Sequence, residues 1–162
     1  MLRRLFVCIT KHHRKTSFIP NPVLLQGYFF ARLSLHDDRP CITIGLRTIP
    51  KDDFLHQAYD IIGCHLVDVR EFEYKGKYFD AWFDEEFLFS GKPLVPTLLL
   101  GGLKKNAFDL ICGSIIIAHS DEEGATCGIT IEEANELASF MYENFLKINK
   151  ASIMGLFGQK SA

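Results

Sequence analysis

The sequence predicts an α+β domain with a mostly antiparallel sheet, a short central helix and a longer C-terminal helix packed on one face. Residues 65–83 alternate apolar and polar side chains on both sides of a turn at 75–77, which is typical of a β-hairpin. Thr130 and Glu133 have the spacing of a capping box, and an amphipathic stripe follows them to about Lys147. Because the two expected helices are separated from the runs of strands, the order of the elements indicates an α+β fold rather than an alternating α/β fold.

The sequence predicts short strands in the first 46 residues of the chain. Residues 5–9 predict one strand, and residues 23–35 predict two or three strand pieces with a bulge or turn at Gly27. The turn signal at 37–40 then leads into a β-branched strand over 41–46.

A short helix is expected over residues 50–63. Its apolar residues fall at helical spacing, Asp52 or Asp53 is placed to cap its start, and Gly63 suits the left-handed position just past its end. Beyond the hairpin, residues 94–103 are apolar without a clear period. The continuous apolar run over 110–118 predicts a single strand that is buried on both faces.

Composition places the chain among ordinary globular domains. It has 162 residues, of which 48% are hydrophobic and 23% are charged, which excludes disordered, collagen-like and disulfide-miniprotein classes. No window of 18 uninterrupted apolar residues occurs, so we expect no membrane-spanning helix.

Charge divides the chain unevenly. Residues 1–50 hold eight basic and two acidic residues, whereas residues 51–150 hold nine basic and eighteen acidic ones. We therefore expect a basic N-terminal extension with short strands over 1–40, a core domain over 41–150 and a flexible tail over 151–162. The basic residues cluster only over 3–15, so nucleic acid is not the expected partner, although binding through this segment remains an alternative.

The five cysteines are odd in number and form no Cys-x-x-Cys pair, which favours a reduced, cytoplasmic location and argues against a zinc site. The apolar stretch over 5–9 is too short for a secretory signal peptide. Cys64 and His65 are neighbours on an expected strand, so their side chains point to opposite faces and need a distant partner to form a dyad. His119 follows the expected buried strand, where functional residues often gather.

Two groups of residues suggest chemistry. Asp80, Asp84, Glu85 and Glu86 form an acidic cluster at the hairpin end, which is either a solvated turn or a divalent-metal site. Paired glycines precede Lys104 and Lys105, as in a phosphate-binding loop, but the full motif spacing is absent. Tyr78 and Trp82 can stack on bases, and Lys92, Lys104 and Lys105 can neutralise phosphate.

Residues 53–146 resemble a small family of phage- and plasmid-borne proteins of unknown function. The resemblance is carried by Ala58–Gly63, the strand His65–Val69, Phe83–Glu86, Gly91-Lys92-Pro93, the strand from Asp109 to Ile117 and the helix opened by Thr130–Glu133. The family pattern continues its Gly-Lys-Pro turn with an Asn, whereas this chain has Leu94-Val95-Pro96. The resemblance implies an accessory protein of a mobile element that acts inside a bacterial cell.

Three functions follow as hypotheses. The first is a non-enzymatic binding protein for a small anionic, nucleotide-like ligand or a host protein, with Tyr78, Trp82, Lys92, Lys104 and Lys105 as binding residues and no cofactor. The second is a metal-dependent hydrolase that uses the acidic cluster, and the third is nucleic-acid binding through the basic N-terminus. We also expect a homodimer, because the chain has more apolar residues than one core of this size should bury. The residues behind that expectation are Phe6, Phe18, Phe29, Phe30, Phe87, Phe89 and Leu98-Leu99-Leu100.

Overall fold

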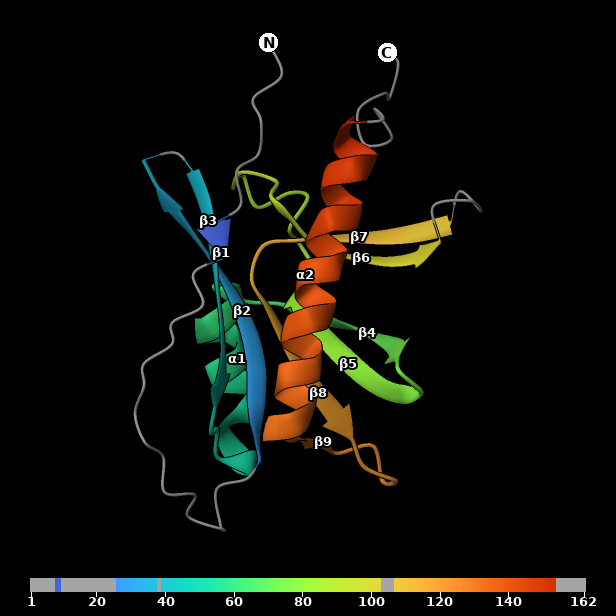
Figure 1. Ribbon diagram of the computed structural model, residues 1–162. Helices are drawn as coiled ribbons and strands as arrows, with labels where there is room; N and C mark the ends of the chain where they lie inside the picture. Colours follow the sequence, from blue (N-terminus) through green and yellow to red (C-terminus); the bar gives the residue numbers. More distant parts are fainter. Residues whose placement is uncertain (1–7, 10–25, 38, 103–106, 154–162) are drawn as a thin grey trace, which may run out of the picture.

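The computed structural model describes residues 8–9, 26–37, 39–102 and 107–153, and it confirms the predicted fold class (Figure 1). The strands are β1 (Cys8–Ile9), β2 (Gln26–His36), β3 (Arg39–Arg47), β4 (Val67–Tyr74), β5 (Lys77–Asp84), β6 (Pro96–Gly102), β7 (Ala107–Cys112), β8 (Ile115–Ser120), β9 (Thr126–Cys127) and β10 (Ile129–Thr130). The helices are a 3-10 turn η1 (Lys51–Asp53), α1 (Phe54–Ile62) and α2 (Ile131–Ile153).

One mixed but mainly antiparallel sheet organises the molecule. Its strand order is β1-β3-β2-β8-β5-β4, in which β1 and β3 run parallel, while β10 pairs with β2 and β9 with β8. Strands β6 and β7 form a separate two-stranded sheet. The boundary expected at residues 40/41 falls inside β3, and β2, from the expected N-terminal extension, lies between β3 and β8.

The two helices cover opposite faces of the large sheet. On one face, α2 packs with the β6–β7 sheet over a core that includes Phe29, Phe79 and Ile117. On the other face, α1 packs over Tyr28, Ile116 and Ala118. Alternation of side chains along each strand explains why neighbours such as Ile116 and Ile117 enter different cores.

The apolar residues that led us to expect a dimer are partly buried and partly exposed in the structure. Phe29, Leu98 and Leu99 are buried within the single chain, whereas Phe89 is exposed. Phe6 and Phe18 lie outside the described residues. The expected homodimer therefore stays a prediction.

The predicted hairpin is confirmed and its turn is tight. Tyr74 pairs with Lys77 across the two-residue turn of Lys75 and Gly76. Both turn residues have positive φ, at 51° for Lys75 and 74° for Gly76, as two-residue hairpins of this twist require.

The single strand predicted over residues 110–118 is wrong, because the chain turns at Gly113. This glycine has a φ of +89° and separates β7 from β8, which belong to different sheets. The Gly113 N–H donates to the Val95 carbonyl at 3.0 Å, and the Thr97 hydroxyl donates to the Gly113 carbonyl at 2.5 Å. The apolar run hides this break because its residues are buried on both sides of the turn.

The N-terminal cap predicted from the sequence is present in α2, whereas the residue expected to cap α1 makes a different hydrogen bond. The Thr130–Glu133 capping box is confirmed, with bonds of 2.9 and 3.2 Å between each side chain and the main-chain N–H of the other residue. Asp53 occupies the N-cap of α1, but its carboxylate accepts from Gln57 Nε2 instead of capping a main-chain N–H. Gly63 ends α1 in the left-handed conformation, as expected. No helix in the described part of the chain is long and apolar enough to cross a membrane.

Candidate functional site

The candidate site surrounds Lys92, in the segment that connects β5 to β6. The Lys92 ammonium donates to the Gly63 carbonyl at 2.5 Å, so it sits at the carboxyl end of α1. A cation is favoured there by the helix dipole and by the unpaired carbonyls of the last turn. The contact joins the end of α1 to a segment that lies 29 residues further along the chain.

Local hydrogen bonds shape the segment that carries Lys92. The Asp84 carboxylate accepts from the Glu86 N–H at 2.9 Å, an Asx-type turn that reverses the chain directly after β5. The Phe89 N–H then donates to the Glu86 carbonyl, and the Ser90 hydroxyl donates to the Phe87 carbonyl. Gly91 has a φ of +70°, which suits a residue without a side chain.

Two cavities flank Lys92. One has a volume of about 370 Å³ and is lined by residues that include His65, Glu86 and Phe89. The other has a volume of about 170 Å³ and reaches inward to Ile62, Cys112 and Gly113. Asp84, Ser90 and Lys92 line both cavities.

Exposed apolar side chains lie at or near these cavities: Phe89 lines the larger cavity, Leu94 lines the smaller one, and Leu88 precedes Phe89 in the chain. Phe89 is 87% exposed, Leu88 61% and Leu94 53%. We call these three residues, together with Asp84, Glu85, Glu86 and Lys92, the Phe89 surface. Large exposed apolar residues beside charged ones are typical of an interaction site.

Cys64 and His65 do not form a nucleophilic dyad. Burial raises the pKa of the Cys64 thiol, and the nearby Asp84 charge raises it further, against smaller opposite effects of the Leu66 N–H and Lys92. The thiol is therefore protonated at neutral pH, whereas a nucleophilic cysteine needs its thiolate form.

The acidic cluster does not converge. Asp80 and Asp84 lie four residues apart on β5, about 13 Å by the rise of an extended strand. The Asp80 carboxylate accepts from the Ser120 hydroxyl, and the Asp84 carboxylate accepts from the Glu86 N–H. Among the described residues, no group of three or more His, Cys, Asp or Glu side chains is placed to hold a metal ion.

The predicted binding residues are dispersed. Tyr78 is exposed and lies opposite Glu73 at the turn end of the hairpin, whereas Lys92 lies beside Asp84 at the other end of β5. The Trp82 ring packs edge-on against Phe54 of α1, with 5.1 Å between ring centroids. Lys104 and Lys105 lie outside the described residues.

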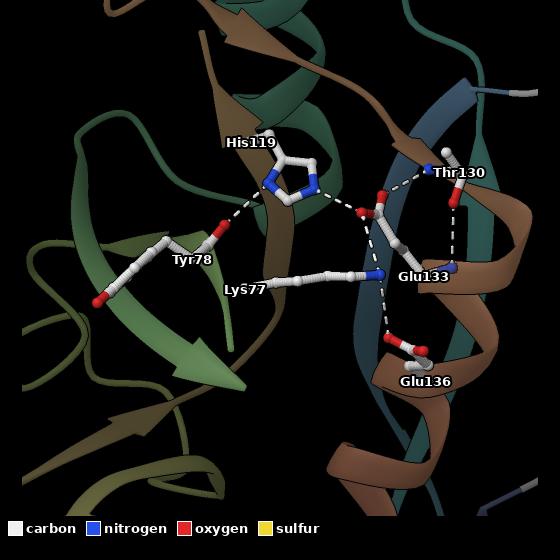
Figure 2. Close-up of polar contacts among 6 residues, drawn as sticks. All are labelled: Lys77, Tyr78, His119, Thr130, Glu133 and Glu136. Carbon is white, nitrogen blue, oxygen red and sulfur yellow. Dashed lines mark hydrogen bonds and ion pairs between the residues drawn. The ribbon is translucent and has the colours of Figure 1, made fainter. Parts of the chain in front are cut away.

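A polar network that the sequence did not reveal joins the hairpin to the start of α2 (Figure 2). The Glu133 carboxylate lies 3.2 Å from His119 Nε2 and 3.6 Å from the Lys77 ammonium, which also lies 3.5 Å from Glu136. His119 Nδ1 lies 2.8 Å from the Tyr78 carbonyl, to which it donates. The spacing of the capping box identified Glu133, but nothing in the sequence pairs it with His119 and Lys77.

This network holds the fold together and leaves His119 no nitrogen for catalysis. Both ring nitrogens face oxygen acceptors of the protein, and the ring stacks on Phe79 at 4.7 Å. A general base needs a nitrogen that reaches its substrate. Burial raises the pKa of Glu133, but the Thr130 N–H, His119 and Lys77 together outweigh it and lower the pKa below its ordinary value.

Residues 37–141 match the sequence profile of DUF3846, a domain of unknown function. The chain belongs to the DUF3846 family. This confirms the resemblance to a family of unknown function that the motifs over 53–146 indicate. No curated protein and no solved structure matches the chain. The Phe89 surface and the His119–Glu133 network both lie within the DUF3846 match.

Proposed function

We propose that this DUF3846 domain is a non-enzymatic binding protein that docks on a partner protein through the Phe89 surface. The observation that carries the proposal is the 87% exposure of Phe89, which lines the larger of the two cavities beside Lys92. Burying an aromatic side chain in an interface contributes strongly to affinity, and such residues are enriched among the positions that dominate binding.

Charge indicates the chemistry of the partner. Asp84, Glu85 and Glu86 precede Leu88 and Phe89 with one residue between them, whereas the Lys92 ammonium is already bonded to the Gly63 carbonyl. The partner that fits carries an apolar side chain next to Lys or Arg, because a basic rim complements the acidic one.

A small anionic ligand is less well supported. Lys92 is the one lysine or arginine that lines either cavity in the described part of the chain, and it shares both with Asp84. Tyr78 and Trp82, the residues expected to stack on a base, line neither cavity. Of the two ligand classes that the sequence suggests, the host protein is therefore the one we propose.

The setting of this function rests on the sequence. The motifs resemble those of phage- and plasmid-borne proteins, which supports an accessory role for a mobile element. The odd cysteine count without a Cys-x-x-Cys pair supports action in the cytoplasm.

Peptide display tests the proposal. The full chain is immobilised and a library of random peptides is selected on it, and enriched peptides are then measured by titration against Phe89→Ser and Tyr142→Ser. Tyr142 is exposed on α2 and serves as the matched control. We expect peptides with an apolar residue beside Lys or Arg, and a loss of affinity of about tenfold or more in Phe89→Ser alone.

Two results would overturn the proposal. One is that every enriched peptide is acidic, or binds Phe89→Ser and the unchanged protein equally well. The other is a wild-type dimer in light scattering that Phe89→Ser converts to a monomer, because a second copy of the chain would then occupy the surface.

A further inference from the structure

A second groove lies along the outer edge of β4, away from the Phe89 surface. It has a volume of about 540 Å³ and is bounded by β4, by Leu99, Leu100 and Gly101 of β6, and by α2. Figure 1 shows the β4–β5 hairpin and the β6–β7 sheet projecting on the same side of α2. The stacked rings of Phe72 and Phe140, 5.0 Å apart, line it.

The edge of β4 offers main-chain groups to this groove. Tyr74 and Lys77 flank a two-residue turn, so they form a hydrogen-bonded pair, and such pairs alternate along the hairpin. Glu73 and Glu71 fall between these pairs, so their N–H and C=O groups point away from β5. In the part of the chain that the structure describes, no strand pairs with this edge.

On the opposite wall, the main-chain groups of Leu99 are already hydrogen-bonded. The Asn144 amide of α2 accepts from the Leu99 N–H at 2.7 Å and donates to the Leu99 carbonyl at 2.9 Å. Asn144 thus takes the place that a neighbouring strand would occupy beside β6. On its outer edge, β4 has no paired strand in the described part of the chain, and we therefore place the added strand there.

The charged residues that line the groove are mostly acidic. Glu71, Glu73 and Asp109 line it together with a single ammonium, that of Lys147. Asp109 has a long ion pair with Arg70, at 3.8 Å, while no ion pair of Glu71 or Glu73 is found among the described residues. Like charges along a strand edge discourage pairing with another copy of the same edge.

We propose that this groove binds an extended, basic segment of a partner protein as an added strand on β4. Successive side chains of a strand point to opposite faces, so Phe72 faces α2 while Glu71 and Glu73 face the other way. An added strand then places apolar residues against Phe72 and Phe140 and basic residues beside Glu71 and Glu73. The segment that fits alternates apolar residues with Lys or Arg. Its main-chain hydrogen bonds to Glu71 and Glu73 contribute affinity that any extended segment would share.

Amide exchange with defined peptides tests this inference. The probes are a hexapeptide that alternates Lys and Val and a matched hexapeptide that alternates Glu and Val, added to the isotope-labelled full chain. We expect the Glu71 and Glu73 amides to exchange rapidly in the protein alone. Saturation with the Lys–Val peptide should slow them about tenfold or more, and the Glu–Val peptide should have no effect.

Variants separate this groove from the Phe89 surface. Glu71→Pro removes the outward N–H without removing a bond between β4 and β5, and we expect it to abolish peptide binding. Glu71→Lys/Glu73→Lys tests the charge contribution should the proline disturb the hairpin. In Phe89→Ser, the Lys–Val peptide should still slow exchange of the Glu71 and Glu73 amides. This measurement reports only on the edge of β4, so this inference and the proposed function fail independently.

Two outcomes would overturn the inference. Slow exchange of both amides in the protein without peptide would show that a segment of the same chain or a second copy already covers the edge. Unchanged binding of the Lys–Val peptide to Glu71→Lys/Glu73→Lys would show that the peptide binds elsewhere.

Discussion

The side-chain amide of Asn144 hydrogen-bonds both main-chain groups of Leu99, and these two contacts fasten the β6–β7 sheet to α2. Asn144 is 1% exposed and Leu99 is 4% exposed, so water does not compete for either bond. A buried amide with both of its groups satisfied costs little, but losing one partner leaves main-chain groups unpaired in an apolar setting.

Asn144→Ala should therefore destabilise the protein strongly. The substitution leaves the Leu99 N–H and C=O without partners, and we expect a loss of about 3 kcal/mol in the free energy of unfolding. Urea denaturation measures it, with Asn135→Ala as a control because Asn135 is exposed on the same helix. A loss no greater than that of the control would contradict the role given to Asn144.

Gly113→Ala should destabilise through backbone strain alone. Gly113 has a φ of +89°, and an added Cβ would meet no atom within 4 Å, so steric overlap does not contribute. A left-handed conformation costs an alanine about 1–2 kcal/mol, and Gly113→Asn should lose less because Asn tolerates this region. Thermal unfolding of both variants tests the order, and equal losses would refute it.

Acid should weaken the protein partly through Glu133. Its pKa is lowered in the folded state from 4.5, so its stabilising contribution is complete above pH 4.5 and disappears as pH falls through the folded pKa. Glu133→Gln cannot titrate, so its free energy of unfolding should change less between neutral pH and this acid range. Urea titrations over that range measure the difference, and parallel pH profiles for the two proteins would contradict the assignment.

Cys64 and Cys112 should resist alkylation while the protein is folded. Burial raises the pKa of both thiols, that of Cys112 to about 11, so little thiolate is present at mildly alkaline pH. Iodoacetamide treatment followed by peptide mass mapping should find both residues unmodified in buffer and modified in urea. Rapid modification of Cys64 in buffer would reopen the case for a reactive thiol there.

Features set by neighbouring residues could be predicted from the sequence. The Lys75-Gly76 turn and the Thr130–Glu133 capping box each depend on contacts within a few positions, and both were predicted correctly. The break at Gly113 was missed because hydrophobic pattern reports burial and not direction. A glycine inside an apolar run was the available signal for that turn.

The candidate site was harder to predict because its residues come from distant segments. Lys92 was singled out, but its contact with Gly63 depends on how α1 packs against the sheet. Tyr78 and Trp82 share one face of β5, as their spacing indicates, yet α1 reaches only Trp82. The pairing of His119 with Glu133 likewise requires β8 and α2 to meet, which no local pattern encodes.

The position of β8 has a consequence for the growing chain on the ribosome. The hairpins β2–β3 and β4–β5 each form from local pairings, and β8 joins them within the described part of the sheet, because it lies between β2 and β5. Until Ile115–Ser120 have been synthesised, the edges of β2 and β5 that pair with β8 stay unpaired. Translation thus delays completion of the sheet, and during that interval the nascent hairpins are the species most exposed to aggregation and to capture by chaperones.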